Sequence, residues 1–113
     1  MSKRIAVVIS GDPTVTGRPV EALRIALGLC AGDHETTVVL LDHAPSLLME
    51  NTEEIVDVDI LEKYLPSFQH LAIPFVVEPG TRIDTLSDDF SVNILPADEI
   101  RRLIRSVDRS LVF

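Results

Sequence analysis

Apolar residues follow two patterns along this chain: short unbroken runs, and longer segments with helical periodicity. Residues 5–9 form a continuous apolar run, which is typical of a strand covered on both faces. The next ten residues contain two glycines and two prolines, which predict a loop. Pro19 suits the first position of a helix that continues through residues 20–31 and ends before Gly32. A second apolar run at residues 37–41 then completes a βαβ unit.

The remaining segments continue the alternation of helix and strand. Asp59 is the predicted N-cap of a helix that Pro66 must kink or divide into two pieces. The other expected elements are a short helix over 44–50, strands over 75–77, 91–95 and 110–113, a turn of helix within 81–89, and a helix starting at Pro96.

This alternation predicts one domain over residues 1–113, a three-layer α/β/α fold around a five-stranded, mainly parallel sheet. The helix over 20–31 has two apolar sides. One side should cover the sheet, and the width of the other favours burial against a second subunit. Gly28, inside this helix, would be tolerated best where a neighbour approaches closely.

Composition and charge narrow the range of functions. Hydrophobic residues make up 46% of the 113, but no apolar run approaches the roughly 20 residues of a membrane helix. A formal charge of −8 argues against nucleic-acid binding, because phosphate contacts require clustered Lys and Arg. The single cysteine excludes an internal disulfide, and we expect a cytoplasmic protein.

Two charged segments have more than one interpretation. Residues 51–62 are rich in acids, which indicates a solvated linker and helix start, or a docking surface for a basic partner. Near the C-terminal end, Arg101, Arg102, Arg105 and Arg109 form a solvated polar face, or a patch that recognises an acidic partner or RNA.

Candidate chemical groups gather where the strands end. Ligands of open parallel sheets bind beyond the carboxyl ends of the strands. The loops there contain Asp12, Asp42, His43, Glu78 and Arg82. An anion could also bind at the helix start near Arg18, although the spacing of the preceding glycines does not match a P-loop.

Neither a metal centre nor a cofactor motif is evident. The three histidines are far apart in the sequence, so no metal-ligand cluster is predicted, and no cofactor is expected. Cys30 is the one available sulfur nucleophile. It lies late in an apolar helix, away from the helix start that would stabilise a thiolate, which favours inert packing.

Several stretches resemble the DsrE/DsrF-like family of small sulfur-relay proteins. The likeness covers nearly the whole chain. It rests on residues 3–10, on Gly17-Arg18 leading into residues 21–27, on residues 38–44, and on the closing segment 94–113.

The resemblance implies a flavodoxin-like, DsrE-type fold in a cytoplasmic protein that assembles with copies of itself or with related DsrE-like subunits. Catalytic members carry a persulfide on a cysteine just after the third strand. Here Glu78-Pro79-Gly80 holds that place, as in the DsrF or TusC branch, whose subunits lack the cysteine. The resemblance therefore favours a non-catalytic subunit over an enzyme. Two alternatives stay open: a sulfurtransferase using Cys30, and a regulatory module that binds a small anion or metabolite.

Overall fold

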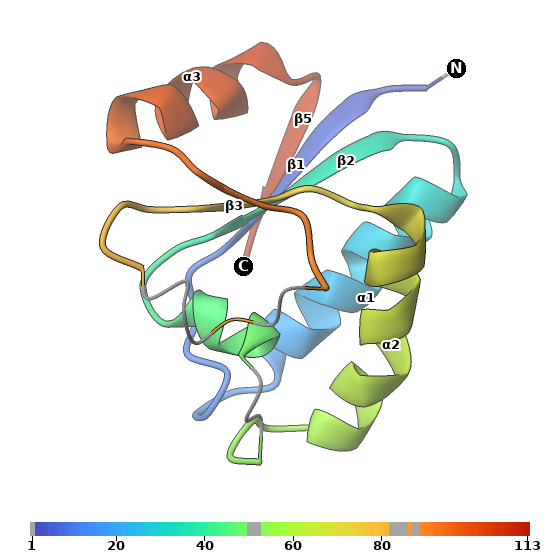
Figure 1. Ribbon diagram of the computed structural model, residues 1–113. Helices are drawn as coiled ribbons and strands as arrows, with labels where there is room; N and C mark the ends of the chain where they lie inside the picture. Colours follow the sequence, from blue (N-terminus) through green and yellow to red (C-terminus); the bar gives the residue numbers. More distant parts are fainter. Residues whose placement is uncertain (1, 50–52, 82–85, 87–88) are drawn as a thin grey trace.

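A computed structural model describes residues 2–49, 53–81, 86 and 89–113 of the chain. It contains a five-stranded sheet with all its strands parallel, in the order β4-β3-β2-β1-β5 (Figure 1). The expected α/β class is therefore confirmed. The strands and helices are β1 (Arg4–Ile9), α1 (Arg18–Ala31), β2 (Glu35–Leu40), the 3-10 helix η1 (Ala44–Leu48), α2 (Val58–Leu71), β3 (Phe75–Val77), β4 (Val92–Ile94), α3 (Ala97–Ser106) and β5 (Arg109–Val112).

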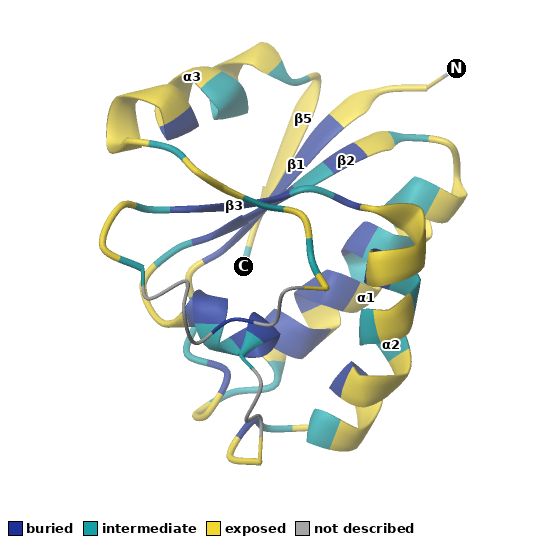
Figure 2. Cartoon of the chain, viewed as in Figure 1, coloured by how far each residue is buried: buried dark blue, intermediate teal, exposed yellow. Residues whose placement is uncertain are grey.

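Helices lie on both faces of the sheet, because alternate residues of the central strands are apolar on both sides. Ile5, Val7 and Ile9 of β1 belong to the larger core, which also contains the inward residues of α1, η1 and α2. Val8 of β1 belongs to a smaller core with Ile100 of α3. Burial is deepest in the central strands, whereas β5 is exposed along its length (Figure 2). The expected three layers are thus present.

The second apolar side of α1 is covered within the same chain. Helix α2 packs beside α1, and its Leu61 and Phe68 are buried in the larger core that Leu23 of α1 also enters. The sequence analysis expected a second subunit on this side, but α2 already packs there, so the width of the apolar surface does not require one. Gly28 also differs from expectation, since a Cβ at this position would meet no atom of the described residues within 4 Å.

Helix α2 begins differently from the prediction. Its N-cap is Asp57 in the left-handed region (φ 61°), with no side-chain capping bond, while Asp59 lies inside the first turn. The expected Asp59 cap is wrong by two residues. Pro66 lies within the single helix and is exposed, so the helix is not divided into two pieces. The turn of helix expected within 81–89 falls largely outside the described residues.

The C-cap of α1 is the predicted residue, Gly32, but its backbone conformation is not the one that usually favours glycine there. Gly32 is the C-cap, yet its φ is −84°, so it does not use the left-handed region that glycine favours. Asp33, with φ 66°, makes the left-handed turn instead, and the chain then enters β2. Aspartate is one of the few residues besides glycine that adopt this conformation at low cost.

Candidate functional site

An open cleft of about 540 Å³ lies beyond the carboxyl ends of β1, β2 and β3. The segments that follow these three strands supply its walls, including part of η1 after β2. The lining consists of Asp12, Thr14, Asp42, His43, Pro45, Ser46, Met49, Glu78, Pro79, Gly80 and Thr81. Parallel strands direct their carboxyl ends to one edge of the sheet, so residues separated in sequence by about 30 positions meet there.

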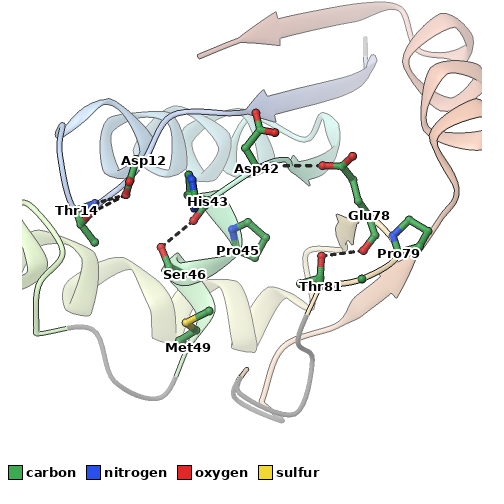
Figure 3. A pocket seen from close by; sticks show the side chains of 11 residues that line it. Asp12, Thr14, Asp42, His43, Pro45, Ser46, Met49, Glu78, Pro79 and Thr81 are labelled. Carbon is green, nitrogen blue, oxygen red and sulfur yellow. Dashed lines mark hydrogen bonds between the residues drawn. The ribbon is translucent and has the colours of Figure 1, made fainter.

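The chain positions Asp42 and His43 through a left-handed turn. Asp42 follows β2 with φ 55°, which redirects the backbone into η1 and places His43 beside the cleft. In Figure 3 the His43 side chain lies between those of Asp12 and Asp42. The hydroxyl of Ser46 donates to the His43 carbonyl oxygen at 2.9 Å and closes this turn.

Glu78 connects the ends of two neighbouring strands. The backbone N–H of Asp42 donates to Glu78 Oε1 at 3.3 Å, and the Thr81 hydroxyl donates to the Glu78 carbonyl oxygen at 2.7 Å (Figure 3). Strands β2 and β3 are adjacent in the sheet, with Leu40 in register with Val77. The carboxylate that follows β3 therefore reaches the backbone that follows β2.

Asp12 is held in the loop after β1 by Thr14. The Thr14 hydroxyl and backbone N–H donate to Asp12 Oδ1 at 2.7 and 2.9 Å. These two hydrogen bonds lower the pKa of Asp12 from its ordinary value, the hydroxyl bond having the larger effect, and the charge of His43 lowers it slightly further. Asp12 is therefore a carboxylate at neutral pH, fixed at the rim of the cleft.

We expect Thr14→Val to raise the pKa of Asp12 toward that of an ordinary aspartate, because valine removes the stronger of the two hydrogen bonds. A lowered native pKa stabilises the fold above the unfolded pKa, and this stabilisation is lost as pH falls through the native pKa. The difference in stability between wild type and Thr14→Val should therefore disappear in acid. NMR titration of the Asp12 carboxyl measures the shift directly, with Thr16→Val as the control; equal Asp12 pKa values in wild type and Thr14→Val would contradict it.

Four of the residues predicted from strand ends meet in this cleft: Asp12, Asp42, His43 and Glu78. Arg18 begins α1 and is not among the lining residues, and Arg82 lies outside the described residues. The described lining carries three carboxylates and no arginine or lysine. Within the described part of the chain, no group of three metal-ligating side chains is placed to hold an ion. That this cleft binds a ligand stays a prediction.

The sequence analysis missed the hydroxyl residues of the cleft. Thr14, Ser46 and Thr81 follow Asp12, His43 and Glu78 by two or three positions, and each closes a local turn. Serine or threonine at this spacing after a polar strand-end residue is a recognisable turn signal. Applied to the sequence, it would have identified all three.

Cys30 lies far from the cleft. It is the penultimate residue of α1, whose first turn is at the cleft end of the sheet and whose last turn precedes β2. It lies twelve positions after Arg18, which corresponds to about 18 Å along a helix. The side chain is half-buried and packs against the larger core. The predicted packing role agrees with this position.

Comparisons with known proteins identify a structural relative. No family model matches the chain, and no curated protein matches its sequence. Among solved structures, the YchN protein from E. coli matches with a TM-score of 0.79 and 20% sequence identity, over the full length of both chains. This likeness shows a DsrE-like, flavodoxin-like fold. In the described residues no helix has the length and apolar character needed to cross a bilayer.

Proposed function

We propose that this chain, which shares the full-length fold of YchN, is a DsrE/DsrF-like sulfur-relay-type protein acting as a non-catalytic subunit of an oligomer. The observation that carries the proposal is the occupant of the position after β3. There the sequence resemblance places a persulfide cysteine in catalytic members, and Glu78 enters the strand-end cleft instead. A carboxylate cannot hold a persulfide sulfur.

The location of Cys30 supports the same conclusion. A persulfide carrier must present its sulfur to a donor and then to an acceptor, which requires an exposed thiol with thiolate character. Cys30 is half-buried at the opposite edge of the sheet from the cleft. Its packing against the core makes the sulfurtransferase alternative the weaker one.

We expect no sulfur transfer to the wild-type protein from a low-molecular-weight persulfide. In such a transfer the protein thiolate attacks the outer sulfur of the donor, forms a protein persulfide and releases the donor thiol. Intact-mass spectrometry should show an unchanged mass for the wild type and for Cys30→Ala. The variant Glu78→Cys/Cys30→Ala, with a thiol in the cleft, is the positive control and should gain one sulfur atom. A persulfide found on Cys30 would contradict the proposal, as would native mass spectrometry that shows monomer alone and with DsrE-like subunits.

A regulatory module that binds a small ligand is the second candidate, favoured by the cleft itself. It brings Asp12, Asp42, His43 and Glu78 together with the apolar side chains of Pro45 and Met49. Such a mixture of convergent polar groups and apolar surface is typical of small-molecule sites. A ligand specific for the folded state raises the melting temperature by mass action. An unchanged melting temperature across panels of small anions and amines would argue against this candidate.

A further inference from the structure

Two exposed surfaces of opposite charge lie on this molecule. The arginine surface consists of Arg101, Arg102 and Arg105, which are exposed on the outer side of α3. The acidic surface consists of Glu54, Asp57, Asp59 and Glu62, which are exposed at the start of α2 and in the loop before it. The chain has ten basic residues and eighteen acidic ones, and three of the ten basic residues lie on α3, whose first turn carries Asp98 and Glu99.

The charges of both surfaces are largely unneutralised within the described chain. Arg102 lies 3.8 Å from Asp98, near the limit of an ion pair, whereas Arg101 and Arg105 have no ionic partner in the described residues. The same holds for Glu54, Asp59 and Glu62. By contrast, Arg24 on α1 is paired with Glu21 one helical turn away.

The two surfaces cannot meet inside one molecule. Helix α3 packs on the sheet face that carries Val8, Val39 and Val76, and α2 packs on the opposite face. In Figure 1 the α3 helix and the loop before α2 lie at opposite ends of the molecule. A contact between them therefore needs two copies of the chain.

We propose that the arginine surface of one copy docks on the acidic surface of a second copy, in a head-to-tail contact. A contact between different surfaces of identical subunits repeats until a ring closes or a filament grows. Ile60, which is 41% exposed, follows Asp59 in the first turn of α2 and supplies apolar area beside the acids. The contact rests on the proposed oligomeric function and specifies the surfaces through which copies assemble.

The head-to-tail contact would be stabilised by several ion pairs that form together. An isolated exposed ion pair contributes little, because water and salt screen it. Three arginines facing four carboxylates act together, and they also repel wrong orientations in which like charges meet. Raising salt from about 0.1 M to about 1 M shortens the screening length from roughly 10 Å to roughly 3 Å, so assembly should weaken with salt.

Charge reversal and charge exchange test the contact by sedimentation velocity. Arg101→Glu/Arg105→Glu should weaken assembly by roughly 100-fold or more, because like charges then face each other across the contact. Glu54→Lys/Glu62→Lys, which avoids the first turn of α2, should do the same. The variant with all four changes restores opposite charges and should assemble again, which also shows that the changes leave the fold intact. Lys3→Glu/Arg24→Glu changes the net charge equally at residues that belong to neither surface, and should leave assembly unchanged.

The outcomes separate this inference from the proposed function. An oligomer that persists in Arg101→Glu/Arg105→Glu overturns the head-to-tail contact while leaving oligomeric function intact. A wild-type protein that is monomeric at all concentrations and salt levels overturns both. Failure of the four-change variant to assemble while both double variants stay folded also overturns the contact, since opposite charges would then be insufficient.

Discussion

Phe75→Ala should lower the free energy of unfolding by about 3–5 kcal/mol, the usual range for removing a fully buried phenylalanine. Phe75 begins β3 and has no exposed surface. Its ring lies 5.4 Å from that of Phe68 and 5.8 Å from that of Phe90, the second contact being edge-to-face. The substitution removes both ring contacts and leaves a cavity between α2 and the sheet.

Urea denaturation at fixed protein concentration measures this effect, since assembly would otherwise add a concentration-dependent term. Phe90→Ala is the matched control. Phe90 is half-buried and has a single ring contact in the described residues, so Phe90→Ala should lower the free energy of unfolding by clearly less. Equal losses for the two variants would contradict the central place of Phe75 in the core. Because β3 leads into Glu78, Phe75→Ala should also disturb the cleft.

Leu23→Ala should lower the free energy of unfolding by about 2–5 kcal/mol. Leu23 is fully buried where α1 packs on the sheet and beside α2. Alanine has the higher helix propensity, so the loss comes from packing and not from the helix itself. Leu29→Ala changes the same atoms on the same helix at a half-buried position. It should cost less than half as much in the same urea titration. An equal loss of unfolding free energy for Leu29→Ala would contradict the view that the deeper burial of Leu23 makes it the more important packing residue.

Much of the fold could be predicted because its elements have strong local signals. The apolar runs that became β1, β2 and β3 were located to within two residues, as was the helix that became α1. A short helix was expected over 44–50, and the structure has η1 there, with Leu47 and Leu48 buried. The start of α2 was misplaced, since the left-handed conformation of Asp57 follows from how the preceding loop packs. The backbone N–H of Val56 in that loop donates to the Pro13 carbonyl oxygen at 2.8 Å. The two residues are far apart in the sequence, so no local pattern indicates this contact.

The candidate site was predicted in part. Strand ends identified Asp12, Asp42, His43 and Glu78, because the parallel arrangement alone places strand ends together. The sequence could not show that Glu78 accepts from the Asp42 backbone, since this depends on β2 and β3 being neighbours in register. It also placed Arg18 as a possible anion contact, whereas α1 presents Arg18 outside the cleft lining.

By itself, the sequence determined the α/β class, the positions of the main strands, and the presence of a glutamate, Glu78, directly after the third strand. These properties depend on residue identity and on periodicity between near neighbours. The tertiary structure decided that α2, and not a second subunit, covers the side of α1, that Thr14 fixes Asp12, and that the arginine and acidic surfaces lie on opposite faces. These properties depend on which segments pack together, and that is settled by the order of the strands in the sheet.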